Sequence, residues 1–232
     1  MNTFADRVME FYGQLNFTGV LPPGIQVMNP IKESDLVLSV VASFYKKFYG
    51  DNRERHLILG INPGRLGGGT TGIPFTDTRR LVEQCGIAYN GKPSHEPSSV
   101  FIYEMISAYG GATKFYNEFY INSVCPLGFT ATGNNGKAIN YNYYDAPALA
   151  AAATPFILQS IQQQLQLGVS REVCFCFGMG KNERFLRRLN EANHFFNRIV
   201  ALEHPRYIIQ YKSANKQQYI EKYLAAFRQV AG

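Results

Sequence analysis

The residue sets best able to carry chemistry stand directly after short apolar runs of the sequence. Four runs end in a polar or glycine-rich set where a plain turn would suffice: Asn62-Pro63-Gly64, Asn122-Ser123, Gly178-Met179-Gly180-Lys181 and Glu203-His204-Pro205. None of these sets pairs a nucleophile with a base or collects metal-ligating side chains. Their amides, imidazole and backbone N–H groups are instead suited to holding a polar ligand and a water molecule.

Asn62 and His204 are the candidate catalytic residues. A carboxamide donates and accepts hydrogen bonds but does not titrate, so Asn62 can hold a water and cannot be a strong base. His204 can donate a hydrogen bond to a developing oxyanion or act near neutral pH. Both residues also have a structural interpretation, because Asn-Pro-Gly is a turn signal and a lone histidine is usually structural.

Phe75 and Asn122 complete a predicted pocket for a flat heterocycle. Phe75 follows a glycine-rich loop and offers a stacking face, although core packing is the usual role of phenylalanine. The carboxamide of Asn122 can pair with an amide or imide edge. A nucleophilic role for Cys125 is the alternative, but no histidine lies within a few residues of it.

The glycine-rich segment 64–72 fits a nucleotide-phosphate loop poorly. A P-loop requires Gly-Lys-Ser/Thr, whereas Gly69 is followed by two threonines. A dinucleotide fingerprint opens a helix directly, whereas Pro74 and Phe75 intervene here. The glycine turn before Lys181 is a better candidate for a phosphate contact, although glycine turns before helices are common.

The elements that must position these residues alternate between strands and helices. Apolar runs predict strands at 56–61, 118–124, 172–178 and 196–202. Apolar spacing and end signals predict helices at 3–16, 33–49, 78–86, 98–111, 145–167, 181–193 and 213–230, with Asp145 as the N-cap of the longest. This order predicts an α/β fold, with a central, mainly parallel four-stranded sheet in a three-layer α/β/α arrangement. Such sheets bind ligands at the carboxyl ends of their strands, so the four residue sets are expected to converge on one cleft.

Length and composition indicate one globular domain over 1–232, with the helical segment 1–50 packed on it. The chain has 232 residues, of which 46% are hydrophobic and 17% charged, and this excludes a disordered chain. A net charge of +6 favours a polyanionic partner weakly. The four cysteines lack the spacing of a zinc or iron–sulfur site, and no apolar run is long enough for a signal core or a membrane span. We expect an intracellular, cytoplasmic protein without metal or cofactor.

Four motifs resemble those of the uracil-DNA glycosylase superfamily, in the same order along the chain. They are GINPG (60–64), TGIPF (71–75), NSVCPLGF (122–129) and HP (204–205). The nearest branch is that of the single-strand-selective monofunctional uracil-DNA glycosylases and their bacterial relatives. GINPG also opens the mismatch-specific uracil/thymine glycosylases, but TGIPF and the His-Pro pair favour the former branch.

The resemblance implies a role for each matching residue. Asn62 would position the attacking water, and His204 would stabilise charge on uracil O2 as the glycosidic bond breaks. Phe75 would stack on the flipped base, Asn122 would read its edge, and the backbone of Ile61 would bond to it. Gly64 stands where the strictest enzymes place a tyrosine, which leaves room for 5-substituted uracils such as 5-hydroxymethyluracil.

The segment after His204-Pro205 departs from the family pattern, because Ser-Pro is replaced by Arg-Tyr-Ile-Ile. Tyr207 or Ile208 would be the wedge that fills the vacated base stack. The basic residues expected to meet phosphates are Arg65, Lys181, Arg206, Lys212 and Lys216. Alternatively, this segment is only a packed connection to the last helix.

The expected function is that of a monofunctional DNA glycosylase of base excision repair, which hydrolyses the N-glycosidic bond of uracil in DNA. No lysine stands in the GINPG motif to form a Schiff base, so no lyase step is expected. The partner would be uracil-containing DNA, single- or double-stranded, bound by a monomer. The alternatives are a DNA-binding module of the same fold with lost activity, a mismatch-specific uracil/thymine glycosylase, and an enzyme acting on free nucleosides or nucleotides.

Overall fold

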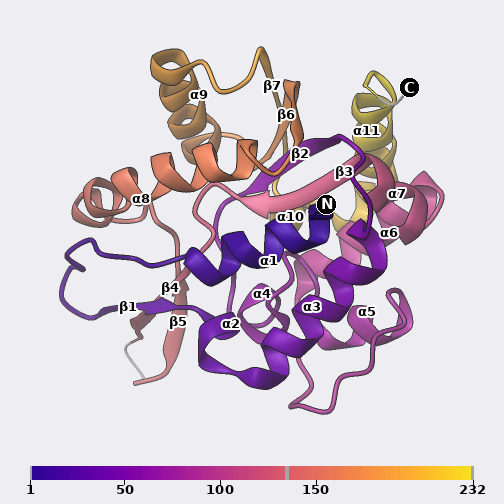
Figure 1. The fold of residues 1–232 in the computed structure, drawn as a ribbon. Coiled ribbons are helices and arrows are strands. Elements are labelled where there is room, and N and C mark those ends of the chain that lie inside the picture. Colours follow the sequence, from indigo (N-terminus) through magenta and orange to yellow (C-terminus); the bar gives the residue numbers. More distant parts are fainter. Residues whose placement is uncertain (1, 134–135, 231–232) are drawn as a thin grey trace.

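A four-stranded parallel sheet forms the centre of the molecule, whose computed structural model describes residues 2–133 and 136–230 (Figure 1). The strands lie in the order β3-β2-β6-β7, and every neighbouring pair is parallel. Their bounds are Arg55–Gly60 for β2, Phe119–Ser123 for β3, Val169–Phe177 for β6 and Arg198–Leu202 for β7. All four predicted strands are confirmed, and each is displaced by at most a few residues.

Helices cover both faces of this sheet, as the three-layer prediction requires. On one face Phe4 of α1 packs edge-on against Tyr120, with ring centroids 5.2 Å apart. On the other face Phe227 of α11 packs against Phe119 and Phe175. Successive residues of a strand point to opposite faces of the sheet, so these two rings lie on the face opposite Tyr120. The main covering helices are α1 (Phe4–Gln14), α6 (Pro97–Tyr109), α8 (Pro147–Leu165), α9 (Lys181–Asn193) and α11 (Lys216–Arg228).

The long helix α8 starts differently from the prediction. Its N-cap residue is Ala146, and no side chain caps it. Asp145 was predicted as the N-cap, but its carboxylate accepts a hydrogen bond from the backbone N–H of Asn142 at 2.8 Å. The aspartate therefore stabilises the turn before the helix instead of the helix itself.

Further helices connect these elements, and four of the short ones were not predicted. The predicted helices at 33–49 and 78–86 are α3 (Asp35–Tyr49) and α5 (Thr78–Glu83). The unpredicted helix α10 (Pro205–Tyr211) begins directly after His204 and carries the segment that departs from the family motif. The others are α2 (Pro30–Glu33), α4 (Gly68–Thr71), α7 (Ala112–Glu118) and the 3₁₀ turn η1 (Ser213–Asn215).

A second, antiparallel sheet was also not predicted. It has the strand order β1-β4-β5, with β1 at Ile25–Met28, β4 at Gly128–Thr132 and β5 at Ala138–Tyr141. These strands are short, and only Gly128 and Phe129 among their residues are buried, so they lack the apolar runs that mark a buried strand. This sheet matters because the residues that end β5 and follow it reach the functional site.

The N-terminal segment packs onto the rest of the chain. Phe4 stacks on Tyr49 of α3, and the hydroxyl of Tyr49 donates a hydrogen bond to the backbone carbonyl of Phe119. These contacts support our proposal of a single domain. No helix within the described part of the chain is long and apolar enough to cross a membrane.

Candidate active site

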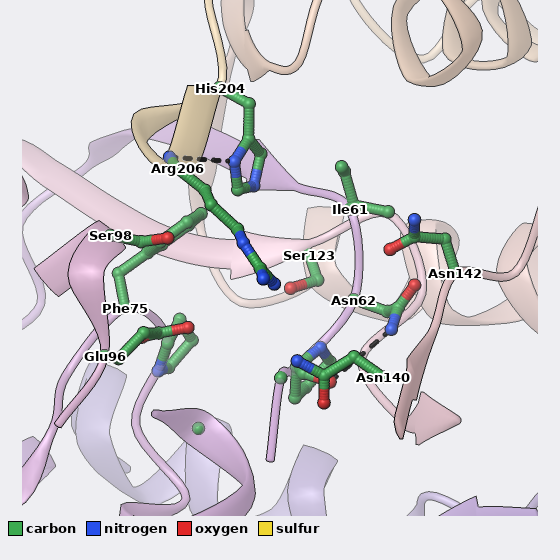
Figure 2. Close-up of a pocket in the computed structure, with 14 residues that line it drawn as sticks. Ile61, Asn62, Phe75, Glu96, Ser98, Ser123, Asn140, Asn142, His204 and Arg206 are labelled. Carbon is green, nitrogen blue, oxygen red and sulfur yellow. Dashed lines mark hydrogen bonds between the residues drawn. The ribbon is translucent and has the colours of Figure 1, made fainter. Parts of the chain in front are cut away.

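A cavity of about 190 Å³ opens at the carboxyl ends of three of the four parallel strands (Figure 2). Asn62 reaches it from the end of β2, Ser123 from the end of β3, and His204 and Arg206 from the segment after β7. Three of the four polar or glycine-rich residue sets that were predicted to converge on one cleft therefore line this cavity. The glycine turn after β6, which leads to Lys181, does not line this cavity.

Asn62 is fixed in one orientation by the residues around the end of β5. Its Nδ2 donates to the carbonyl of Tyr141 at 3.2 Å and to that of Pro63 at 3.4 Å. Its Oδ1 accepts from the backbone N–H of Tyr143 at 3.1 Å. The amide hydrogens are thereby used, and one lone pair of Oδ1 is left to accept an O–H from a water.

Phe75 presents a preset aromatic ring to the cavity. Its φ of 53° lies in the left-handed region, which is unfavourable for a bulky residue. The ring is held edge-on against Phe177, with centroids 5.9 Å apart, and lies 5.6 Å from the ring of His204. A backbone held in an unfavourable conformation at a pocket wall is typical of a functional position.

His204 is the N-cap residue of α10, and its ring points into the cavity (Figure 2). The Nδ1 atom accepts a hydrogen bond from the backbone N–H of Arg206 at 3.2 Å. Burial, together with the positive charge of Arg206, lowers the pKa of His204 to about 4. The ring is therefore neutral at physiological pH, and its proton is on Nε2, which can donate to an oxygen in the cavity.

Asn122 does not line this cavity but lines a smaller one that shares Pro63, Gly68 and Pro74 with it, and its reading of the base edge stays a prediction. The residue is buried, its Nδ2 donates to the hydroxyl of Tyr120 at 2.8 Å, and its Oδ1 accepts from the N–H of Ser123 at 2.8 Å. Its strand neighbour Ser123 lies beside Gly60, over which the Phe75 ring packs. Successive residues of a strand point to opposite faces of the sheet, so the side chain of Ser123 is the one that faces this cavity.

Ile61 and Gly64 both line the cavity, and their contact with a base stays a prediction. The carbonyl of Ile61 already accepts a hydrogen bond from the N–H of Cys125 at 3.1 Å. A Cβ at Gly64 would lie 3.3 Å from Nδ2 of Asn140 and 3.4 Å from Oε1 of Glu96. The space above Gly64 is thus bounded by two polar side chains, which limits the size of any substituent that could enter it.

Comparison with known proteins agrees with this geometry. Residues 47–228 match the family model of the Uracil DNA glycosylase superfamily. The chain belongs to this superfamily. It is therefore a DNA glycosylase, which is a hydrolase. The fold is also similar to the crystal structure of wild-type SMUG2 from Pedobacter heparinus, with a TM-score of 0.97 and 58% sequence identity over 99% of both chains. No curated protein is significantly similar in sequence.

Several residues of the glycosylase cavity were missed by sequence analysis: Glu96, Ser98, Ser123, Asn140 and Asn142. Asn140 lies at the end of the unpredicted strand β5, and its Oδ1 accepts the backbone N–H of Arg65 at 2.9 Å. Glu96 and Ser98 lie at the start of α6, far in sequence from every motif. The only available signal was the run Asn140–Tyr144, whose alternating asparagines and tyrosines are unusual for a plain loop.

Arg65 and Arg206, predicted to meet phosphates, border a second cavity of about 370 Å³. It adjoins the first one and shares Glu96, Ser98 and Asn140 with it. The Nε atom of Arg65 is buried there without a hydrogen-bond partner among the described residues. Figure 2 shows the side chain of Arg206 extending from the start of α10 toward the middle of the glycosylase cavity.

The other residues predicted to contact DNA differ in their exposure to solvent and in their ion pairs. The side chain of Ile208 is fully buried, which contradicts its assignment to DNA contact, whereas Tyr207 is 42% exposed. Lys212 is exposed at the end of α10, and Lys181 is exposed at the start of α9, where it lies 5.8 Å from the ring of Tyr144. Lys216 forms a salt bridge with Glu104 at 2.6 Å.

Neither a cysteine nor a metal cluster is suited to catalysis in the described part of this glycosylase. Cys125 is buried, and burial raises the pKa of its thiol to about 12. It remains protonated at physiological pH and does not line the cavity. No group of three or more His, Cys, Asp or Glu residues among those described could hold a metal ion.

Proposed function

We propose that this glycosylase removes uracil from DNA by hydrolysis and leaves an abasic site, as the first step of base excision repair. The observation that carries the proposal is the convergence of Asn62, Phe75 and His204 on one cavity. A stacking ring, a held water and a neutral donor are what hydrolysis of a flipped base requires. The names of the matching family and of the similar structure support the same activity.

The donor at His204 supplies the stabilisation that the departing base needs. Cleavage of the glycosidic bond leaves an oxocarbenium-like sugar and places negative charge on the base. An Nε2–H group fixed by the Nδ1 hydrogen bond can donate to the O2 atom of that base. Removing one such donor commonly costs about 100-fold or more in rate.

Asn62 completes the reaction by holding the attacking water. The leaving group carries the charge, so the water needs placement more than deprotonation. The free lone pair of Oδ1 can accept an O–H of this water and keep its oxygen directed at the sugar. No lysine lines the cavity among the described residues, which favours hydrolysis over Schiff-base chemistry and thus a monofunctional enzyme.

The region outside the cavity fits a nucleic acid strand. Arg65, Arg206 and Lys212 offer positive charge to phosphates, and the exposed ring of Tyr207 can fill the vacated base stack. The glycine at position 64 favours acceptance of small 5-substituents, within the limit set by Asn140 and Glu96. We further propose that the enzyme acts as a monomer.

The proposal is tested with an oligonucleotide that carries one uracil, in single-stranded and duplex form. Enzyme treatment followed by alkali should cleave the strand at the uracil. Asn62→Ala and His204→Ala should each lower the rate about 100-fold or more while the folded protein retains its circular dichroism spectrum. Salt-sensitive DNA binding without cleavage of uracil or 5-hydroxymethyluracil substrates would instead indicate a DNA-binding protein that has lost the activity.

A further inference from the structure

The second cavity, bordered by Arg65 and Arg206 and called the outer cavity below, has an apolar wall that phosphate contacts do not explain. Leu66 and Ile139 both line it, and they are 44% and 46% exposed. Single exposed apolar residues are common on protein surfaces, but these two come from different elements and meet in one hollow of about 370 Å³. This volume lies within the range of about 300–1,000 Å³ that is usual for ligand pockets.

The two apolar residues are held in place relative to each other. The backbone N–H of Arg65 donates to Oδ1 of Asn140 at 2.9 Å. This bond joins the residue before Leu66 to the residue after Ile139. The carbonyl of Arg65 accepts from the hydroxyl of Thr70 at 2.8 Å, which ties the glycine-rich loop together. The apolar wall is therefore formed before any ligand binds, which lowers the cost of ordering it.

The same loop rests on the residue that precedes α6. A Cβ at Gly67 would lie 1.9 Å from Oε2 and 2.4 Å from Cδ of Glu96, so a side chain there would displace this carboxyl group. The backbone N–H of Glu96 in turn donates to Oδ2 of Asp77 at 3.0 Å. The glycine at 67 thus lets the loop that carries Leu66 lie directly against a fixed support.

The polar part of the outer cavity is positively charged. Among the described residues, none forms an ion pair or a hydrogen bond with the guanidinium group of Arg65 or of Arg206. Glu96 is the one acidic residue in the described part of the lining. Two guanidinium groups beside one carboxyl group favour an anion, and a phosphate is the anion that a nucleic acid offers.

The outer cavity continues into the glycosylase cavity. Both are lined by Glu96, Ser98, Asn140 and Arg206. Figure 2 shows the side chain of Arg206 in the glycosylase cavity, opposite Asn140 and above Glu96. A nucleotide whose base occupies the glycosylase cavity continues into a neighbouring nucleotide, and the outer cavity is the adjoining space that offers this neighbour both apolar contact and positive charge.

We propose that the outer cavity binds the nucleotide next to the uracil on the same strand. Leu66 and Ile139 contact the face of its base, and Arg65 and Arg206 contact its phosphate. This inference rests on the proposed function and adds a binding site outside the uracil pocket. Aliphatic side chains such as leucine and isoleucine pack against base faces, and such contacts do not distinguish the bases by hydrogen bonds.

The first experiment removes the neighbouring base. The substrates are single-stranded oligonucleotides with one uracil and a tetrahydrofuran abasic analogue in place of its 5′ or its 3′ neighbour. We expect kcat/KM of the wild type to fall about 10-fold for one of these two placements, which identifies the side that enters the outer cavity. Equal kcat/KM on both of these substrates and on the unmodified strand would overturn the proposal.

The exposed apolar residues are tested with the same substrates. Leu66→Ala and Ile139→Ala should each lower kcat/KM on the unmodified strand and lose most of the response to the missing base. Leu38→Ala is the matched control, because Leu38 is a leucine of similar exposure, 42%, that lies on α3 and lines neither cavity. It should respond as the wild type does. If Leu66→Ala and Ile139→Ala kept the full response, the base would not lie on this wall.

The second experiment removes the charge of the phosphate. The binding probe contains 2′-fluoro-2′-deoxyuridine, which resists hydrolysis, and an uncharged methylphosphonate linkage between it and the neighbour. This linkage should weaken binding by the wild type about 10-fold and binding by Arg65→Gln much less. Arg53→Gln, a change near the amino end of β2 at the opposite edge of the sheet, is the control and should respond as the wild type does. An equal loss in Arg65→Gln and in the wild type would remove Arg65 from the phosphate site.

The two experiments separate this inference from the proposed function. Uracil release that is indifferent to the neighbouring base and linkage would refute only the inference. Binding of the uncleavable probe that depends on the neighbour, in a protein that releases no uracil, would refute only the proposed function.

Discussion

The ring of Phe75 occupies the space that a side chain at Gly60 would need. A Cβ on Gly60, the last residue of β2, would lie 2.8 Å from Cζ and 2.9 Å from Cε2 of this ring. The ring of Phe75 and the end of the strand that leads to Asn62 are therefore fitted to each other. The bare backbone at Gly60 sets how deeply the ring can sit in the cavity.

Gly60→Ala is expected to displace Phe75 and impair catalysis. Aromatic atoms under 3 Å from the new Cβ must move, and misplacement by about 1 Å commonly costs about 100-fold in rate. We expect kcat/KM for uracil release to fall by about that factor. The fold should survive with a loss of about 1–3 kcal/mol in the free energy of unfolding. Phe75→Ala, measured in the same assay, gives the loss in kcat/KM when the ring is absent. A Gly60→Ala enzyme of full activity would contradict the fitted geometry.

The lowered pKa of His204 predicts how stability depends on pH. The histidine of the unfolded chain binds a proton below about 6.5, whereas that of the folded chain stays neutral down to about 4. The unfolded state therefore binds more protons between pH 6.5 and 4, and the wild type should lose stability as the pH falls through this window. Urea unfolding should show a loss of about 3 kcal/mol that His204→Ala does not share. Equal pH dependence in both proteins would show that His204 titrates normally.

The strong local patterns were enough to predict the sheet and the placement of Asn62 and His204 at one cavity. Apolar runs such as 172–178, ended by turn residues, predicted the four strands. The carboxyl ends of parallel strands lie at the same edge of a sheet, so the residues that follow them come close together. Asn62 and His204 were found because they directly follow such strands. These are properties that a few consecutive residues determine.

Contacts between distant segments could not be found in this way. Glu96 enters the cavity only because Asp77 and Ser99 hold its backbone, and neither contact leaves a sequence pattern. The place of Ser123 in the cavity wall was not predicted, since the two faces of a strand alternate and a motif does not say which of its polar residues takes which face. Exposed strands such as β5 carry no apolar signal at all.

Asn122 and Ser123 are predicted to have separate roles. Asn122→Ala removes two buried hydrogen bonds, to the hydroxyl of Tyr120 and the N–H of Ser123, and should lower the free energy of unfolding by about 1–3 kcal/mol. Ser123→Ala should leave stability nearly unchanged and raise KM for uracil release. Urea unfolding and steady-state kinetics on both variants check this division. A catalytic defect in a fully stable Asn122→Ala protein would instead support a base-reading role for Asn122.

Tyr207 and Ile208 test how α10 meets DNA. Tyr207 is exposed and its ring lies 5.5 Å from that of the exposed Tyr211, whereas Ile208 is fully buried. A side chain that fills a vacated base stack matters for duplex DNA more than for a single strand. Tyr207→Ala should therefore lower the rate on duplex uracil substrates about 10-fold more than on single-stranded ones. Ile208→Ala should instead destabilise the fold by about 2–4 kcal/mol without changing that ratio. If Tyr207→Ala slowed both substrates equally, Tyr207 would not be the wedge.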